Sequence, residues 1–210
     1  MEMNISEEPF PHIHMSGNEK MYLSAKATFL KRKDATLDSG RRNNVPIVNN
    51  KALSSYLNEV TDNAYKLLYP YLKAEYPKWV LEDKRSRFLY SHNKASSEPF
   101  SARDWHLDSG DKLIVGLWYL PHPEDNSGGD LLIRNSESGS EYRIPYKENT
   151  LILFPNLTTS WHKVDVRNPS KHDRTFINIV TEQRQDNCLH NYSRQANGTD
   201  CLISVKNNYK

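Results

Sequence analysis

Three residues of this chain, His106, Asp108 and the later His162, could together hold a metal ion. A His-x-Asp pair followed at a distance by a second histidine is the ligand set of the two-His-one-carboxylate facial triad, the usual site of non-haem Fe(II). Side chains two residues apart on a strand point to the same face, so His106 and Asp108 would both face inward. Three ligands on one side of an ion leave positions open for reactants, which is typical of a catalytic metal site.

Arg174 follows His162 by twelve residues and begins the run Arg174-Thr-Phe-Ile-Asn-Ile-Val180. A buried cation at that distance is what a dicarboxylate co-substrate would need. A His-x-Asp pair alone occurs by chance in many proteins, and a single histidine is more often a surface or core residue. The complete set in this order is a much more specific signal.

Short strands are the elements that would position these side chains. From Arg87 onward, eight apolar or alternating segments are separated by turn-forming residues such as Ser109-Gly110, Gly128-Gly129 and Pro155-Asn156. Eight short, evenly punctuated strands predict a double-stranded β-helix, or jelly roll, with an open mouth for a small ligand. The expected strands are 88–91, 102–107, 112–120, 130–134, 141–145, 150–154, 160–166 and 175–181.

We expect one domain over residues 1–210, mainly β with α: a double-stranded β-helix core over 87–181 and a supporting N-terminal helix over 48–76. Apolar residues recur in 48–76 at three- and four-residue spacing, which predicts a helix packed against a sheet. Asn49 or Asn50 would be its N-cap, and Pro70 could break or kink it. Residues 1–46 are expected to be an irregular extension, in which 20–31 could form a strand or short helix. Residues 182–210 are expected to be a polar extension, with one edge strand at most.

Composition excludes several classes of function. The net charge of +2 gives no bulk attraction to nucleic acid, and we expect the basic clusters 31–33 and 41–42 to be solvated loops. No apolar run approaches eighteen residues and no signal peptide is recognisable, so we expect a cytoplasmic protein that does not bind membranes. Cys188 and Cys201 are too few for a disulfide framework. Free thiols are preferred over one disulfide in the tail.

The segments around the candidate ligands extend the pattern. In these segments the chain resembles the Fe(II)/2-oxoglutarate-dependent dioxygenases, in particular the prolyl-4-hydroxylase-like branch, over roughly residues 85–182. In that family a His-x-Asp pair is followed by a Tyr-Leu strand, a Gly-Gly-acidic-Leu turn, a strand ending in Phe-Pro, the distal histidine and a basic residue. The matching segments here are Trp105-His-Leu-Asp108, Gly116-Leu-Trp-Tyr119-Leu120, Ser127-Gly-Gly-Asp-Leu131, Asn149-Thr-Leu-Ile-Leu-Phe154-Pro155, Trp161-His-Lys-Val164 and Arg174-Thr-Phe-Ile-Asn178.

The resemblance implies specific roles and cofactors. Fe(II), 2-oxoglutarate as co-substrate and O2 would be required, and the expected reaction is hydroxylation of an unactivated C–H bond. Halogenases of this type replace the ligand carboxylate, which is present here as Asp108; desaturation and ring closure stay open. The implied iron ligands are His106, Asp108 and His162. Arg174 and Tyr119 match family contacts to the far carboxylate of 2-oxoglutarate, and Tyr90 is a weaker match to a cofactor contact. Asn178 shares strand parity with Arg174 and could face the pocket.

The substrate and the remaining histidines are less constrained. A small molecule, such as an amino acid or natural-product intermediate, is favoured because the two extensions could fold over the mouth of the core. The alternatives are a peptidyl, prolyl-type hydroxylase and a non-catalytic, cupin-like metal-binding module, while nucleic-acid demethylation ranks last. His122 is expected to be exposed, His172 to lie on a loop or strand start, and His92 to reach the pocket mouth. Trp105 and Trp161 are expected to pack on the outer face of the barrel.

Overall fold

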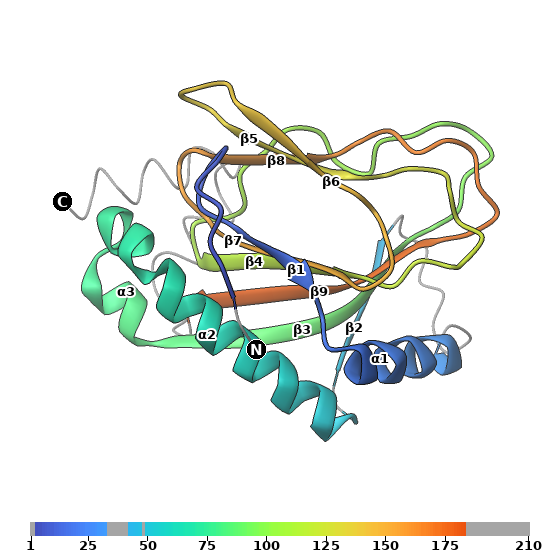
Figure 1. Cartoon of the computed structure of the whole chain (residues 1–210), viewed down its shortest axis with the longest axis horizontal. Coiled ribbons are helices and arrows are strands. Elements are labelled where there is room, and N and C mark those ends of the chain that lie inside the picture. The colour runs from blue at the N-terminus through green and yellow to red at the C-terminus, as the bar shows by residue number, and fades with distance from the viewer. Residues whose placement is uncertain (1–2, 33–41, 48, 184–210) are drawn as a thin grey trace.

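Two antiparallel sheets and a set of helices form the three layers of the protein (Figure 1). This is a computed structural model, and it describes residues 3–32, 42–47 and 49–183. The larger sheet has the strand order β1-β7-β4-β9-β3-β2 and the smaller has the order β6-β5-β8. The larger sheet comprises β1 (Ile13–Ser16), β2 (Arg42–Pro46), β3 (Lys84–Asn93), β4 (Lys112–Tyr119), β7 (Thr150–Pro155) and β9 (Arg174–Gln183), and the smaller comprises β5 (Leu131–Asn135), β6 (Glu141–Ile144) and β8 (Ser160–Val164).

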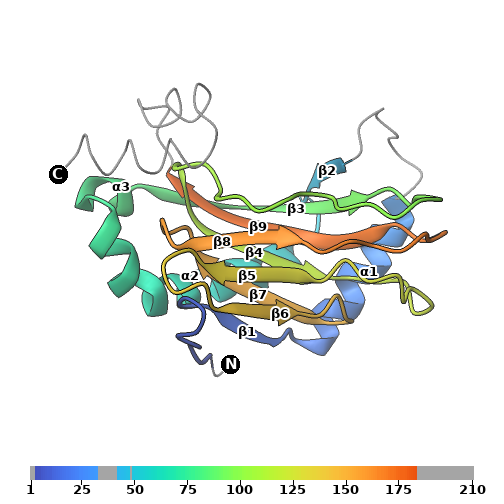
Figure 2. The ribbon, with the colours of Figure 1, turned by 90° about the horizontal axis from the view of Figure 1, so that it is seen from above.

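The smaller sheet lies over one face of the larger sheet, and the helices cover the opposite face (Figures 1 and 2). These helices are α1 (Glu19–Arg32), α2 (Lys51–Glu75) and α3 (Lys78–Glu82). The two facing antiparallel sheets form the double-stranded β-helix that the strand pattern predicts. The open space between them is where such folds hold a ligand.

Alternation along the strands of the larger sheet gives the molecule two hydrophobic cores. On β4, Val115 and Tyr119 belong to the core between the sheets, whereas Trp118 belongs to the core beneath the helices. On β9, Phe176 faces the smaller sheet and Ile177 faces the helices. Because side chains alternate with period two, one set of strands both supports the helices and furnishes the interior between the sheets.

Helix α2 is the main support of the larger sheet. Its buried residues recur at helical spacing: Leu53, Leu57, Val60, Thr61, Ala64, Leu68 and Leu72. The N-cap is Asn50, which is one of the two residues that the sequence predicts for this position. Its side-chain oxygen accepts a hydrogen bond from the Leu53 amide at 3.0 Å. Pro70 lies inside the helix, which continues to Glu75. The apolar stripe therefore packs on the outer face of the sheet.

The expected strand over 102–107 is wrong. In this segment His106 forms one isolated bridge with His162, and a further backbone bond joins Val164 N–H to the Arg103 carbonyl at 3.1 Å. Local side-chain bonds compete with a regular ladder. The Asp104 carboxylate accepts from the Trp105 amide at 2.8 Å, and the Asp104 carbonyl bonds the His106 ring at 2.7 Å.

The expectation of an irregular segment over 1–46 is also wrong for the described part. Strand β1 pairs with β7, β2 pairs with β3, and 20–31 falls within helix α1. These two strands are short and sit at the edges of the larger sheet, where pairing depends on backbone groups more than on an alternating side-chain pattern. The side chains of the basic clusters 31–33 and 41–42, and both Cys188 and Cys201, lie outside what the structure describes.

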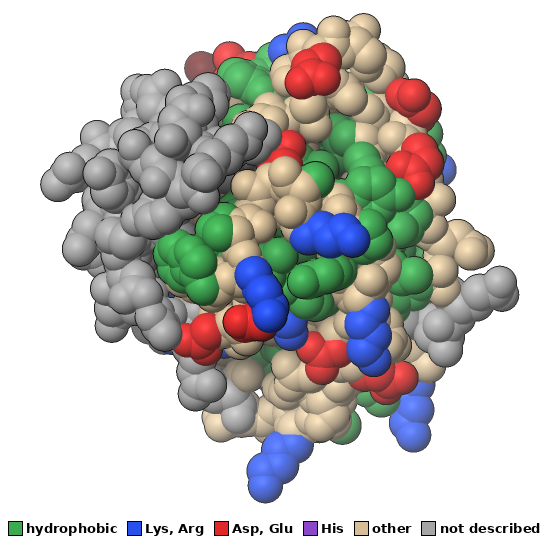
Figure 3. Space-filling model, turned by 90° about the vertical axis from the view of Figure 1, so that its left-hand side faces the viewer, with side chains coloured by type: hydrophobic (Ala, Val, Ile, Leu, Met, Phe, Trp, Pro, Cys, Tyr) green, Lys and Arg blue, Asp and Glu red, His purple; other side chains and the backbone are tan. Residues whose placement is uncertain are grey.

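The side of the molecule shown in Figure 3 carries both signs of charge. Basic and acidic side chains are interspersed among hydrophobic ones over its described part. Among the described helices, none combines the length and the apolar character needed to cross a membrane.

Candidate metal centre and cofactor pocket

A cavity of about 230 Å³ lies among the residues singled out by the sequence. Its wall contains His106, Asp108 and His162 together with Arg174 and Asn178. Apolar residues of the inner core, residues of the loop before His106 and two further polar residues complete the lining: Val115, Leu117, Leu131, Phe154, Val164, Phe176, Phe100, Ser101, Ala102, Arg103, Asn93 and Lys112. The fold therefore brings the candidate metal ligands and the distant arginine into one largely apolar space.

His106, Asp108 and His162 converge although they come from different segments. One possible ligand atom from each lies within 4.8 Å of the other two. His162 Nε2 is 3.6 Å from Asp108 Oδ2, and the two imidazole centroids are 4.1 Å apart. Reciprocal backbone bonds of 3.1 Å between His106 and His162 fix the approach of the two segments. The three groups could hold one divalent ion from a single side.

Backbone carbonyls orient both imidazoles. His106 Nδ1 is 2.7 Å from the Asp104 carbonyl oxygen, and His162 Nδ1 is 3.3 Å from the Ser160 carbonyl oxygen. A carbonyl only accepts, so each Nδ1 carries the proton and each Nε2 keeps a free lone pair. Metal-ligating histidines are held in this way in proteins, because a bond at one nitrogen sets the tautomer and the direction of the other.

The charge state of the three groups suits metal binding. Burial lowers the pKa of His106 to about 3, helped by the neighbouring His162 ring, and burial also lowers the pKa of His162. Burial alone would raise the pKa of Asp108, but the ammonium of Lys112, 2.7 Å away, and His162 outweigh it and hold that pKa below its usual range. At neutral pH the cluster thus offers two neutral imidazoles and one carboxylate.

Arg174 is a deeply buried cation at one end of this cavity. Its side chain is 1% exposed, and it donates to the Gly129 carbonyl at 2.9 Å and to the Tyr119 hydroxyl at 3.1 Å. The guanidinium carbon lies 4.9–5.2 Å from the ring centroids of Tyr119, Tyr146 and Phe176. None of the described carboxylates forms an ion pair with it, although an isolated buried charge is unfavourable.

Tyr119 stays protonated beside this arginine. Burial raises the pKa of its hydroxyl to about 12, although the Arg174 charge acts in the opposite direction. The oxygen accepts from Arg174 Nη2, so the hydroxyl proton remains for donation to another acceptor. Tyr119 lies behind Arg174 and is not itself among the residues that line the cavity.

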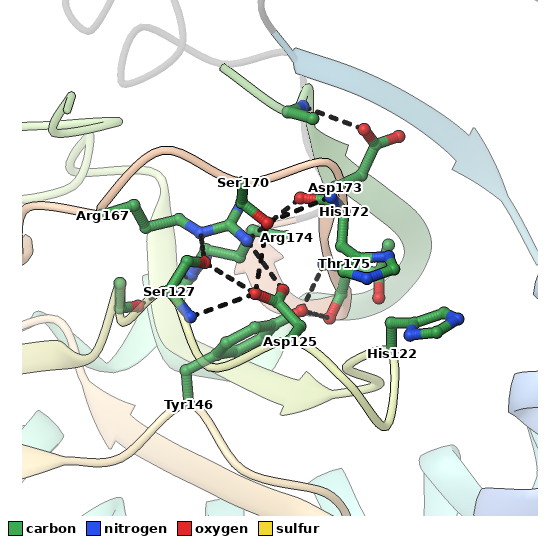
Figure 4. Close-up of polar contacts among 12 residues, drawn as sticks. His122, Asp125, Ser127, Tyr146, Arg167, Ser170, His172, Asp173, Arg174 and Thr175 are labelled. Atoms are coloured by element: carbon green, nitrogen blue, oxygen red, sulfur yellow. Dashed lines mark hydrogen bonds and ion pairs between the residues drawn. The ribbon is translucent and has the colours of Figure 1, made fainter. Parts of the chain in front are cut away.

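A second buried arginine, which sequence reasoning missed, supports the turn that holds Arg174 (Figure 4). Arg167 is 2% exposed; its Nη2 pairs with Asp125 Oδ2 at 2.7 Å and its Nε donates to Ser127 Oγ at 2.9 Å. A Cβ added at Gly129 would lie 2.5 Å from Arg167 Cγ. The Gly128-Gly129 turn is thus packed between the two arginines. Asp125 and Arg167 are 42 positions apart and form no motif, so the sequence held no signal for the pair.

Tyr90 is placed differently from the expected cofactor contact. It pairs with Ile177 across β3 and β9, belongs to the core beneath the helices and packs against Phe29. By strand parity its side chain leaves on the face opposite the cavity, whose lining does not include it. The expected contact is therefore corrected. Asn178 does line the cavity, in keeping with the parity that it shares with Arg174.

The other predicted positions fall mostly outside the cavity. His92 does not reach the pocket mouth; it pairs with Asp173 at 2.9 Å, on the same sheet face as Tyr90. Trp105 lies beneath the cations of Arg134 and Lys163, at 4.1 and 5.0 Å from its ring centroid, so it stacks on charged side chains away from the metal ligands. His122 is exposed, as expected.

Comparison with known proteins agrees with this geometry. Residues 95–180 match the model of the 2OG-Fe(II) oxygenase superfamily. A prolyl-4-hydroxylase from Pseudomonas putida shares the fold at TM-score 0.58 and 15% identity, covering 83% of this chain and 93% of that one. A prolyl hydroxylase from Trichoplax adhaerens was solved in complex with a hypoxia inducible factor oxygen degradation domain peptide fragment. It shares the fold at TM-score 0.54 and 15% identity, covering 82% of this chain and 83% of that one. IDO from Bacillus thuringiensis shares the fold at TM-score 0.56 and 13% identity, covering 83% of this chain and 93% of that one.

No curated protein sequence matches the chain. The family match nevertheless covers His106, Asp108, His162 and Arg174. It favours the predicted oxygenase over a non-catalytic cupin-like module. Residues 95–180 therefore match the domain of an oxygenase superfamily that uses Fe(II), 2-oxoglutarate and O2.

Proposed function

We propose that His106, Asp108 and His162 bind Fe(II), and that Arg174, positioned by the Tyr119 hydroxyl, binds the far carboxylate of 2-oxoglutarate. The observation that carries this proposal is a three-ligand cluster and an unpaired buried cation in one cavity. Two neutral imidazoles and a carboxylate are a donor set that suits Fe(II) and leaves positions free for reactants. A guanidinium with no carboxylate among its described partners supports a dianionic co-substrate as the missing counter-charge.

When bound, Fe(II) and 2-oxoglutarate would together activate O2, the oxidant for C–H hydroxylation, and the protein supplies binding and orientation. His106 and His162 would hold the metal through Nε2 while their Nδ1 protons stay on backbone carbonyls. Arg174 would bind a carboxylate of the co-substrate, while the Tyr119 hydroxyl, which accepts from Arg174 Nη2 at 3.1 Å, would position the guanidinium. Asn178 offers amide hydrogen bonds in the same cavity, and Phe154, whose ring meets His162 edge-on at 5.0 Å, excludes water from the metal side.

The test is turnover of 2-oxoglutarate by the full chain. With Fe(II), ascorbate and O2, we expect succinate to form from 2-oxoglutarate, slowly without a substrate and faster with one. Asp108→Ala should abolish this turnover because it removes an anionic ligand, whereas Asp62→Ala on the exposed side of α2 should retain it. Equal turnover by the wild-type and Asp108→Ala proteins would refute the proposal.

For the substrate, we propose a small molecule that carries a carboxylate, such as an amino acid. Arg103 lines the cavity, its side chain is 51% exposed, and its closest described anion is Asp108 at 3.9 Å. If Asp108 binds iron, the Arg103 guanidinium is available to an anionic substrate near the metal. The described N-terminal segment extends the edges of the larger sheet through β1 and β2, so its expected place over the mouth of the core does not support a small substrate.

The second candidate is a peptidyl, prolyl-type hydroxylase, because two structures with the same fold are prolyl hydroxylases. At 15% identity this likeness concerns the fold and does not identify a substrate. A screen of free amino acids, organic acids and proline-containing peptides, read as substrate-stimulated succinate release, separates the candidates. Stimulation by small carboxylates that is lost in Arg103→Ala supports the first candidate. Stimulation by peptides alone, unaffected by Arg103→Ala, supports the second.

A further inference from the structure

We propose that His122, Glu124 and His172 form a second binding site for a divalent transition-metal ion such as Zn²⁺, Ni²⁺ or Co²⁺. One possible ligand atom of each residue lies within 4.8 Å of the other two. His122 and Glu124 belong to the loop after β4, and His172 lies just before β9 (Figure 4 labels both histidines). Two imidazoles and a carboxylate are the same donor types as in the cavity, with affinity for the later first-row metals.

The first argument is an unsatisfied nitrogen. His172 Nε2 is buried and has no hydrogen-bond partner in the described structure. Buried polar atoms without partners are rare, and ligation of an ion is one of the usual reasons for them. The Nε2 atom is 3.6 Å from Glu124 Oε2, which is too long for a hydrogen bond.

The second argument is the size of that gap. Two ligands that bind one ion at about 2.1 Å with a tetrahedral angle lie about 3.4 Å apart. The 3.6 Å between His172 Nε2 and Glu124 Oε2 is close to this separation. It also equals the 3.6 Å between His162 Nε2 and Asp108 Oδ2 in the cavity. The nitrogen and the oxygen are therefore spaced to share a metal ion.

The third argument is that the two loops hold these histidines side by side. Their imidazoles are stacked, with centroids 3.9 Å apart and planes at 11°, so the exposed His122 ring would turn to direct a nitrogen at an ion bound in the plane of the His172 ring. His122 lies between Pro121 and Pro123, whose rings restrict the backbone of its loop. The backbone of His172 is held at both ends, since its N–H donates to Ser170 Oγ at 3.0 Å and its carbonyl accepts from Arg167 at 3.1 Å.

Binding of the ion would break one hydrogen bond and one ion pair, and both are weak. The Glu124 amide donates to His122 Nδ1 at 3.2 Å, so binding at this ring would break that bond or shift the ring proton. Lys171 Nζ lies 3.4 Å from Glu124 Oε2, but both side chains are largely exposed. Exposed ion pairs contribute little to stability, so Glu124 is readily available to a cation. A bound ion would join the loop after β4 to the loop before Arg174.

The experiment counts bound ions by calorimetric titration of the metal-free full chain with Ni²⁺. To remove donors outside the described residues, the background carries Cys188→Ser, Cys201→Ser and His190→Ala. With an intact cavity triad we expect two ions per chain. His122→Ala should reduce this to one, and Glu124→Gln should weaken the second ion at least tenfold. His14→Ala, on an exposed histidine of β1, should change neither value.

A protein with His106→Ala and His162→Ala makes the two sites separately testable. We expect it to bind one ion, and adding His122→Ala should abolish binding. If the cavity triad does not bind metal, the wild-type background will bind one ion that disappears with His122→Ala, which supports the second site alone. The proposal is overturned if the protein lacking His106 and His162 binds no ion, or if His122→Ala leaves the stoichiometry unchanged.

Discussion

The described residues contain two sets of two histidines and one carboxylate, and the two sets differ in how they are held. In the cavity, Asp108 is 3% exposed and both imidazoles are oriented by backbone carbonyls. At the surface, His122 and Glu124 are exposed and belong to one loop. Both sets have a nitrogen and an oxygen 3.6 Å apart. Similar spacing thus occurs in two environments, and the cavity set alone has Arg174 in the same enclosed space.

Removal of the cavity carboxylate should give the largest effect. Asp108→Ala leaves two neutral ligands, so we expect Fe(II) affinity to fall more than about 100-fold, beyond the effect typical of outer-shell changes. Succinate formation should become undetectable. Equilibrium dialysis with Fe(II) under anaerobic conditions measures the first quantity. Retention of wild-type affinity would show that the cavity cluster is not the iron site.

Arg174→Ala should separate co-substrate binding from metal binding. Loss of a buried charge pair costs about 2–5 kcal/mol, which corresponds to a roughly 30- to 5000-fold higher KM for 2-oxoglutarate. Fe(II) affinity should stay unchanged, because Arg174 does not contact the ligands. Arg174→Lys should recover part of the loss, and the surface variant Arg134→Ala should show none. An unchanged KM would remove Arg174 from the co-substrate site.

Lys112→Met tests how the surroundings tune the cavity set. Lys112 Nζ lies 2.7 Å from Asp108 Oδ1 and holds the carboxylate in place and ionised. Outer-shell partners of metal ligands typically contribute 10- to 100-fold in affinity, and we expect a loss of about that size for Fe(II). Lys163→Met, a cation near Trp105, is the matched control. Equal affinities in the two variants would assign Lys112 no such role.

Gly129→Ala tests the turn beneath Arg174. The φ of Gly129 is +88°, and an added Cβ would lie 2.5 Å from Arg167 Cγ. We expect a loss of about 1–3 kcal/mol in the free energy of unfolding, together with weaker 2-oxoglutarate binding. Gly139→Ala is a sharp control, because Gly139 has φ +74° and no atom within 4 Å of the added Cβ. If urea unfolding gives the two variants the same loss in free energy of unfolding, the effect of Gly129→Ala comes from backbone conformation and not from the contact with Arg167.

The smallest effect concerns pH and the metal-free protein. Burial lowers the pKa of His106 to about 3 and also lowers that of His162, so below pH 6.5 the unfolded chain binds more protons than the folded one. Stability should therefore decrease as the pH falls. Between pH 7 and 6 we expect less than about 1 kcal/mol for each histidine. Urea unfolding at the two pH values measures this, and His106→Asn with His162→Asn should reduce the difference to the part that His12 and His14, whose pKa values burial also lowers, contribute.

The sequence was most informative where residue type and order carry chemistry. His162 and Arg174 lie on strands that the pattern predicts, and Asn178 follows from its parity with Arg174. His106 and Asp108 are recognisable by residue type and order, although no strand forms at 102–107. Tyr90 was misplaced because one position along a strand changes the face of the sheet. Strands β1 and β2 were missed because edge pairing uses backbone groups, and the strand at 102–107 fails because Asp104 bonds its own neighbours. Contacts between distant loops, such as Arg167 with Asp125, leave no local pattern.

The most direct test is an anaerobic titration of the metal-free protein with Fe(II) and then 2-oxoglutarate, followed by absorption spectroscopy. We predict a weak metal-to-ligand charge-transfer band at one Fe(II) per chain in the wild-type and His122→Ala proteins. The band should be absent from His162→Ala and should require much more 2-oxoglutarate in Arg174→Ala. A band that persists in His162→Ala, or none in the wild-type protein, would contradict the assignment of the cavity as the iron and 2-oxoglutarate site.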